Sequence, residues 1–217
     1  MSNKKHKMCA KLVDKTCAIV YNVIAYKLCA ERKVRDMTNK NKNLYNDSEL
    51  KNEFIKNFGE DHWEEEEVLA VLVKDCMHIS VFLGVEALPI CFENIQEDSR
   101  LILEYPTHIE INRKYLHNHE ECLKSICHEL RHVYQIYKAA DPENERHERW
   151  HKELFNHFTP INLNDKVSVV EYNTKEVEID AYAFTQVILN QEYGLTIKHP
   201  NKAYQIIIEA YIDKYYN

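Results

Sequence analysis

Apolar residues recur at helical spacing along most of the chain, and one short region breaks this pattern. In the first third, the segments Cys9 to Val34 and Ser48 to Phe58 carry apolar residues three and four positions apart, so each predicts a helix. The second segment ends at Gly59, a residue that suits the end of a helix. A further predicted helix runs from Glu65 to Leu83 and is ended by Gly84.

The pattern changes between residues 88 and 112 to short β-prone runs separated by turn residues. The runs are Leu88 to Glu93, Leu101 to Tyr105 and His108 to Asn112, and together they predict a small three-stranded sheet. Polar and apolar residues alternate in the last run, which favours a half-buried or edge strand.

Helical periodicity then returns and continues to the end of the chain. A capping pair, Asn118 and Glu121, predicts the start of the first of these helices, and Gly194 predicts the end of the third. The four predicted helices are Asn118 to Ala139, Glu143 to Phe158, Asn173 to about Glu192, and Lys202 to Tyr215.

This order of elements predicts an α+β fold that is mostly helical. A small three-stranded sheet packs beside the first of the four helices, and the C-terminal half is helical. We divide the chain into a helical N-terminal region of unknown role, residues 1–87, and a second domain, residues 88–217.

Composition narrows the classes of function. The 217 residues are 45% hydrophobic and carry a formal net charge of -7, which argues against a nucleic-acid-binding surface. The apolar run from Cys17 to Tyr26 is interrupted by Asn22 and is too short to span a membrane. Seven cysteines without C-x-x-C spacing indicate reduced thiols, so we expect a cytoplasmic protein that binds neither membrane nor nucleic acid.

The pattern H-E-x-x-H occurs twice, from His128 to His132 and from His147 to His151. On a helix, histidines four residues apart lie on one face and can share a zinc ion, with the glutamate beside them as a general base. The first copy lies in a strongly amphipathic segment, which gives its histidines the rigid, partly buried wall that a catalytic zinc requires. Arg131 is a mild departure, because that inner position is usually uncharged.

The second copy is flanked by charged residues and is the weaker candidate. His157 stands where the H-E-x-x-H-x-x-G-x-x-H pattern would place a third ligand, but that pattern needs glycine where Leu154 stands. It also needs a downstream methionine turn, and the last methionine of the chain is Met77. We therefore assign the metal to His128 and His132.

A zinc site with two histidines needs a third protein ligand, and the segment EVEIDAYAF offers Glu176, Glu178 and Asp180. Glu176 has a structural explanation, since with Asn173 as N-cap it would complete a capping box. Glu178 lies beside the apolar seam that begins at Val177, so its carboxylate is well placed to reach a metal.

An H-E-x-x-H helix followed by Glu-x-x-Ala-x-x-Phe resembles the gluzincin metallopeptidases, and most of all the compact minigluzincins of the ImmA/IrrE type. It also resembles a group of uncharacterised bacterial and phage metallopeptidase-like proteins, and the likeness covers about residues 88 to 192. The resemblance implies that Glu178 is the third zinc ligand, with Ala181 and Phe184 in register. Many gluzincins carry an acidic or amide residue where Tyr182 stands, so Asp180 is an alternative as the residue that orients a histidine, or as the ligand itself.

These observations predict a zinc-dependent metallopeptidase that acts on a peptide or protein substrate. Glu129 is the expected general base, and the strand from His108 to Asn112 is expected to pair with the substrate backbone. The resemblance further implies a tyrosine or histidine that stabilises the oxyanion, and fourteen tyrosines leave that residue unassigned. Gln135 shares the ligand face and is expected to tether a neighbouring helix. The alternative function is a non-catalytic protein-binding module on the same fold, with a structural zinc or none.

Overall fold

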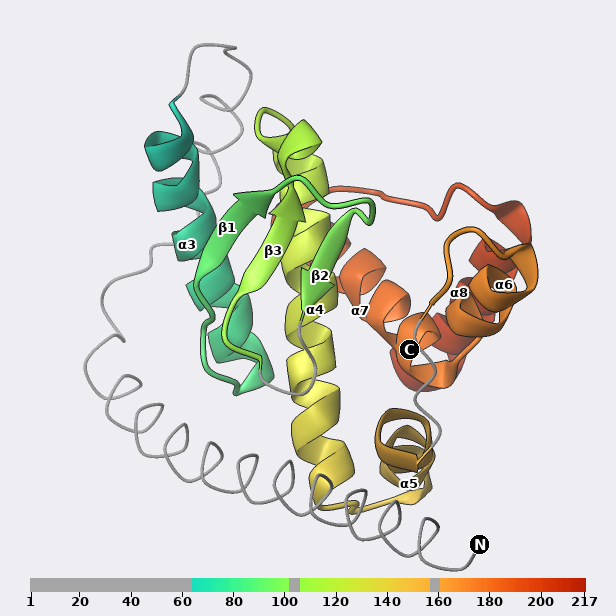
Figure 1. Cartoon of the computed structure of the whole chain (residues 1–217). Coiled ribbons are helices and arrows are strands. Elements are labelled where there is room, and N and C mark those ends of the chain that lie inside the picture. Colours follow the sequence, from blue (N-terminus) through green and yellow to red (C-terminus); the bar gives the residue numbers. More distant parts are fainter. Residues whose placement is uncertain (1–63, 102–105, 157–160) are drawn as a thin grey trace, which may run out of the picture.

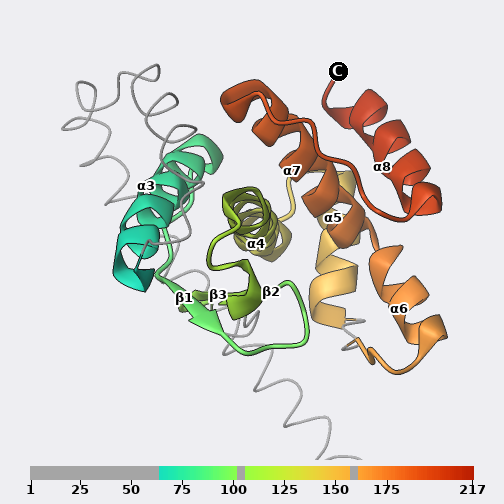
Figure 2. The ribbon, with the colours of Figure 1, turned by 90° about the horizontal axis from the view of Figure 1, so that it is seen from above.

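The computed structural model describes residues 64–101, 106–156 and 161–217, and the long helix α4 (His119–Ala140) runs through its centre. Figure 1 shows the three-stranded sheet on one side of α4. Figure 2 shows that α3 (Glu65–Leu83) and α7 (Glu176–Tyr193) flank α4 on opposite sides. The predicted α+β class is confirmed, because the structure is mostly helical and its small sheet contacts the helix that carries the first H-E-x-x-H. The predicted helices before Gly59 lie outside the described residues.

The sheet has the strand order β1-β3-β2, with β1 at Ile90–Glu93, β2 at Ser99–Leu101 and β3 at Ile109–Asn112. β3 pairs in parallel with β1 and antiparallel with β2. It is therefore the central strand, and all four of its residues are buried. The prediction of a half-buried or edge strand at His108 to Asn112 is wrong.

Hydrogen bonds to the polar residues of β3 explain this difference. Ile109 and Ile111 are fully buried in the main core, as the alternation predicts. Glu110 on the other face is paired with Arg100 of β2. Asn112 donates from Nδ2 to the carbonyl oxygens of Ile95 and Glu97, at 2.7 and 2.8 Å. Since these partners satisfy the polar groups, the second face of β3 is buried as well.

α3 has the predicted bounds and shares one core with the sheet and α4. The side chains of Glu64 and Glu67 form a capping box at its start, and Gly84 ends it in the left-handed conformation, at φ 68°. The boundary that we placed between residues 87 and 88 lies inside this core. Its members from these elements include Leu72, Ile79, Phe92, Ile111, Ile126 and Leu130.

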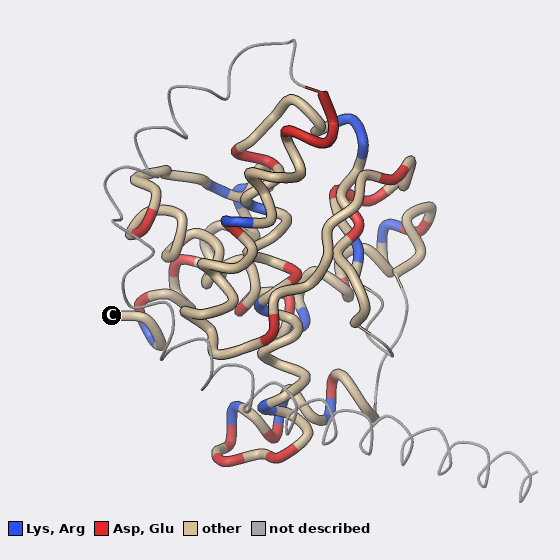
Figure 3. The backbone as a smooth tube through the Cα atoms, turned by 90° about the vertical axis from the view of Figure 1, so that its left-hand side faces the viewer, with Lys and Arg blue, Asp and Glu red and all other residues tan. Residues whose placement is uncertain are grey.

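Charged residues of both signs are interspersed along the described backbone, and acidic residues gather at Glu64–Glu67, where α3 begins (Figure 3). Glu65 of this group pairs with Arg113 beside the sheet. Within the described ranges, no helix combines the length and apolar character that crossing a bilayer requires.

The C-terminal half contains more breaks than the sequence pattern predicts. The helix predicted from Glu143 to Phe158 is α5 (Glu145–His151) followed by one π-helical turn (Lys152–Asn156), and residues 157–160 lie outside the described ranges. The stretch before α7 contains a separate short helix, α6 (Lys166–Asn173). α8 (Lys202–Tyr215) has the predicted bounds.

The start of α7 differs from the prediction in a way that matters for the site. Because α6 ends at Asn173 and Lys175 is the N-cap of α7, the predicted capping box of Asn173 and Glu176 is wrong. The carboxylate of Glu153 instead accepts the backbone N–H groups of Glu176 and Val177, both at 3.0 Å. This contact fixes the first turn of α7, which carries Glu178.

Candidate metal centre

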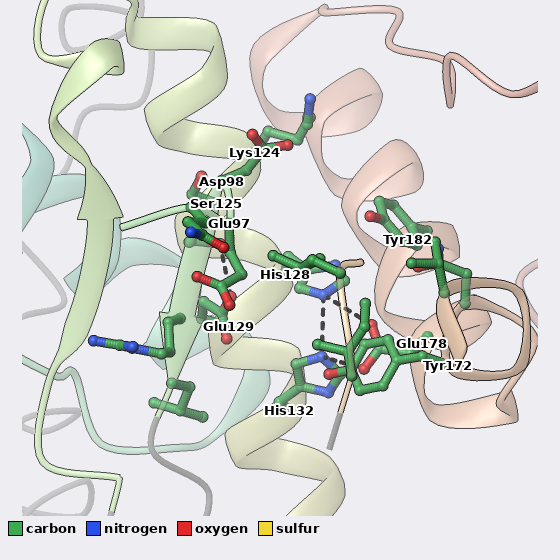
Figure 4. A pocket seen from close by; sticks show the side chains of 18 residues that line it. Glu97, Asp98, Lys124, Ser125, His128, Glu129, His132, Tyr172, Glu178 and Tyr182 are labelled. Atoms are coloured by element: carbon green, nitrogen blue, oxygen red, sulfur yellow. Dashed lines mark hydrogen bonds and ion pairs between the residues drawn. The ribbon is translucent and has the colours of Figure 1, made fainter. Parts of the chain in front are cut away.

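Three potential ligand atoms converge between α4 and α7 (Figure 4). His128 and His132 are one helical turn apart on α4, so their rings project from the same face. Glu178 reaches them from the first turn of α7. The two Nε2 atoms lie 3.0 Å apart, and each lies 3.4 Å from a different oxygen of Glu178, Oε2 for His128 and Oε1 for His132.

These separations fit one zinc ion. Four ligands at the usual zinc distances of about 2.0–2.1 Å, arranged as a tetrahedron, lie about 3.3 Å from one another. One ligand atom from each of the three side chains lies within 4.8 Å of the others, so they approximate one face of such a tetrahedron. Among the described residues, this is the one group of three or more His, Cys, Asp or Glu side chains with such spacing.

Burial and charge favour a cation at this place. The side chains of His132 and Glu178 are each 6% exposed. Burial opposes the charge on His132, but the neighbouring Glu178 carboxylate outweighs it and raises the pKa of His132 to about 9. Burial likewise raises the pKa of Glu178, and the two histidines outweigh it and hold that pKa well below its usual range. Glu178 is therefore an anion that requires a positive partner.

Gln135 fixes the proton on His132. Its Nε2 donates to the carbonyl of Val177 and to Oδ2 of Asp180, both at 2.8 Å, and both of these oxygens only accept. The amide oxygen of Gln135 must therefore face His132, whose Nδ1 lies 2.8 Å from it. Nδ1 must then carry the proton and donate it in this hydrogen bond. In the neutral ring the lone pair is then on Nε2, the atom aimed at Glu178. Gln135 thus orients the ring of His132 and also tethers α7, as the sequence predicts.

His128 is held differently. Its Nδ1 makes no hydrogen bond within the described residues, although metal-binding histidines usually have such a partner. The ring packs instead against Tyr182, with the centroids 4.7 Å apart. Tyr182 therefore holds the ring of His128 by packing and not by a hydrogen bond.

The other two acidic candidates face away from the metal centre. Asp180 is fully buried and bound by Arg131 and Gln135, so it reaches His132 only through the amide of Gln135. Glu176 accepts hydrogen bonds from Arg149 and Tyr211. Of the three acidic candidates, only Glu178 lies close to His128 and His132.

Glu129 lies between the metal centre and the sheet. It is 5% exposed, and its Oε1 accepts a 2.7 Å hydrogen bond from the hydroxyl of Ser99 on β2. Figure 4 shows its carboxylate on the sheet side of the two histidines, with Tyr172 and Tyr182 on the opposite side. All these side chains line one cleft of about 660 Å³.

The cleft has walls of different character. One wall is the end of the sheet, with residues 96–101, and the other comes from α6, α7 and the turn before α6. The second wall contributes the apolar side chains Ile161, Leu163 and Val169. The three candidate ligands therefore face a cleft between a strand and an apolar surface.

The second H-E-x-x-H does not form a comparable site. Both ring nitrogens of His147 are engaged, by the backbone N–H of Glu143 and by the side chain of Asn144, and the ring stacks on Trp150. Nδ1 of His151 donates to the carbonyl of Ala139 at 2.8 Å. His151 thus ties the end of α5 to the end of α4, and His147 holds the turn before α5. His157 lies outside the described residues.

Three functional contacts have no sequence signal that we identified. Ser99 and Tyr172 reach the cleft from separate elements, and no spacing connects them with the histidines. Glu153 caps α7 from the π-helical turn. For Gln135 a signal existed, because it lies three residues after His132 and seven after His128, on the same helical face.

Comparison of the chain with models of known protein families, with curated proteins and with solved structures finds no match in any of the three. The function is therefore inferred from the geometry of the site.

Proposed function

We propose that the protein is a zinc-dependent metallopeptidase whose metal is held by His128, His132 and Glu178. The observation that carries this proposal is the convergence of two imidazole nitrogens and one carboxylate, whose ligand atoms all lie within 4.8 Å of one another, beside a buried glutamate in an open cleft. Catalytic zinc sites typically have three such protein ligands and one open position. When bound there, zinc supplies a Lewis acid and lowers the pKa of a water molecule to about 7.

Glu129 is the general base in this proposal. It accepts a proton from the attacking water and passes it to the nitrogen of the leaving amine. The hydroxyl of Ser99 donates a 2.7 Å hydrogen bond to Oε1 of Glu129 and holds this carboxylate at the edge of the cleft. A purely structural metal site has no use for a carboxylate in this position.

The substrate strand is assigned to β2. We expected the strand from His108 to Asn112 to pair with the substrate, but β3 has strands on both sides. β2 pairs with β3 along one edge, and no described strand pairs with its other edge. Ser99, Arg100 and Leu101 of β2 line the cleft, so an extended peptide that pairs with β2 passes the metal centre.

Tyr172 is the donor that we assign to the carbonyl oxygen of the substrate. Burial raises the pKa values of both Tyr172 and Tyr182, and the nearby Glu178 raises them further, so both phenols keep their protons at neutral pH. The ring of Tyr172 lies beside Glu178, at the proposed metal centre. The ring of Tyr182 is instead engaged with His128.

The decisive experiment compares the wild type with Glu129→Gln. The substitution keeps shape and hydrogen bonding but removes the base, so we expect full zinc occupancy and cleavage at least ~100-fold slower. Because the substrate is unknown, both proteins should be incubated with a native proteome, and the new N-termini counted by mass spectrometry. His147→Ala with His151→Ala is the matched control and should retain both zinc and cleavage.

The same experiment separates the enzyme from a non-catalytic binding module. Identical N-terminal profiles for the wild type and Glu129→Gln, at full zinc occupancy, would show that the protein does not cleave peptides under these conditions and favour the binding module. Purified wild-type protein without near-stoichiometric zinc would contradict the metal site itself.

A further inference from the structure

α3 carries two apolar stripes on opposite sides. One is buried against α4 and the sheet and consists of Val68, Leu72, Cys76, Ile79 and Leu83. The other consists of Ala70, Val73, Met77 and Val81, three or four residues apart, and we call it the outer stripe. Val73 is 42% exposed and Val81 is 53% exposed.

One packing surface cannot cover both stripes of α3. With about 100° between successive residues, their mean directions differ by roughly 145° around the helix axis. Figure 2 shows that described elements cover one side of α3 only. A surface helix normally turns polar residues outward, whereas a helix that is apolar all round is covered on both sides.

The chain supplies a segment of suitable pattern and position. Residues 48–58 form the predicted amphipathic helix that immediately precedes α3, with Leu50, Phe54, Ile55 and Phe58 as its apolar residues. Only residues 59–64 connect it to α3, a length typical of connections between antiparallel neighbouring helices. A short connection makes this segment available to α3 at little entropic cost.

The spacing of the two segments also agrees. In an antiparallel pair, the register that places Phe58 beside Ala70 also places Ile55 beside Val73. In the same register Leu50 falls beside Met77, within one residue. Because both helices rise about 1.5 Å per residue, these three contacts repeat at matching heights.

We propose that residues 48–58 pack antiparallel on the outer stripe of α3 and form a helical hairpin with it. The hairpin adds a layer to the core on the side of α3 that faces away from α4. The N-terminal region is then part of the same folded unit as the metal centre, at least from residue 48 onward.

The test is a double-mutant cycle in the full-length protein, followed by thermal unfolding. Val73→Ser should lower the Tm by roughly 4–8 °C, as for loss of a buried side chain in a chain of this size. The matched control is Val167→Ser on α6, where the side chain is 63% exposed, and its Tm should change by less than about 2 °C. Ile55→Ser should lower the Tm like Val73→Ser, and the double variant should lose clearly less than the sum of the two.

Leu50→Ala with Met77→Ala gives a second pair at the other end of the hairpin, for use if a serine variant fails to fold. Coupling in either pair supports the proposal. Additive effects in both pairs, or a Val73→Ser change no larger than that of Val167→Ser, would overturn it. A Tm that rises with protein concentration, together with a dimer that Val73→Ser dissociates in analytical ultracentrifugation, would assign the outer stripe to a second copy instead.

Discussion

Arg131 and Asp180 form a bidentate ion pair in the interior, with Nε to Oδ2 at 2.7 Å and a second bond of 3.1 Å to Oδ1. The guanidinium is enclosed by aromatic rings, and Asp180 is fully buried. The pair joins α4 to α7, the two helices that carry the candidate ligands, and gives Arg131 a structural role inside the first H-E-x-x-H. The rings around Arg131 belong to Tyr134, Trp150, Phe184 and Tyr216.

The same carboxylate acts on the metal centre through Gln135. Since Asp180 accepts from Gln135, and Gln135 accepts from His132, the position of the ion pair sets the orientation of a ligand ring. Tyr216 also donates to Asp180, at 2.9 Å, and extends this network to the last residues of the chain.

Gln135→Leu should weaken zinc binding by about 10–100-fold, because His132 loses the acceptor that fixes its Nδ1 proton. A competition titration with a chromogenic chelator measures this. Gln186→Leu is the matched control, since Gln186 is paired with Gln205 of α8 and not with a ligand. Equal zinc affinities of the two variants would show that the hydrogen bond to Gln135 does not orient His132.

Glu178→Ala should weaken zinc binding by orders of magnitude, whereas Glu176→Ala should retain it. Glu176 is paired with Arg149, whose side chain is 40% exposed, so its loss should lower the free energy of unfolding by at most about 1 kcal/mol. Zinc content after dialysis and urea denaturation measure the two effects separately. Stoichiometric zinc in Glu178→Ala would move the third ligand to another residue.

The regular elements were predictable because local signals agree with tertiary packing. Gly84 and Gly194 both end helices in the left-handed conformation, and α8 has the bounds that its pattern predicts. Helical spacing predicts that His128 and His132 share one face, whereas the choice of Glu178 over Glu176 and Asp180 depended also on the resemblance to the gluzincins.

The wrong predictions concern residues whose hydrogen-bond partners lie far away in the sequence. The polar residues of β3 looked solvent-facing because Asn112 finds its acceptors in a loop fifteen or more residues away. The sequence predicts a capping box of Asn173 and Glu176. In the structure, the carboxylate of Glu153, from another element, accepts the backbone N–H of Glu176 and caps α7 instead. Tyr172 could not be chosen among the tyrosines because the break between α6 and α7 determines its position.

Tyr172→Phe should lower kcat by about 10²–10³-fold if its hydroxyl stabilises the oxyanion, with little change in KM or zinc content. Tyr182→Phe keeps the ring that packs on His128 and is the matched control, with an expected loss below tenfold. Steady-state kinetics on a peptide taken from the proteome experiment measure both. A fall in zinc content of Tyr172→Phe, without a separate loss of kcat, would make Tyr172 a residue that orients Glu178.

A second polar pair, distant from the cleft, predicts the dependence of stability on pH. Oδ2 of Asp75 on α3 lies 3.6 Å from Nε2 of His119, the first residue of α4. Burial raises the pKa of Asp75 to about 7 and lowers the pKa of His119 to about 3. Between about pH 4 and 6.5 the folded pair therefore holds one proton, on Asp75, and the unfolded pair also holds one, on His119. The two contributions cancel.

Asp75→Asn removes this cancellation. In the variant, His119 alone binds an extra proton in the unfolded chain between pH 6.5 and 3, so the free energy of unfolding should fall as the pH drops through that window. Relative to the wild type, the loss should be about 1 kcal/mol for each pH unit between 6.5 and 4.5. Urea denaturation of both zinc-loaded proteins at several pH values measures the difference, in which equal metal contributions cancel. A difference that stays constant across this range would mean that Asp75 keeps the pKa of an exposed carboxyl, and that the junction of α3 and α4 is open to water.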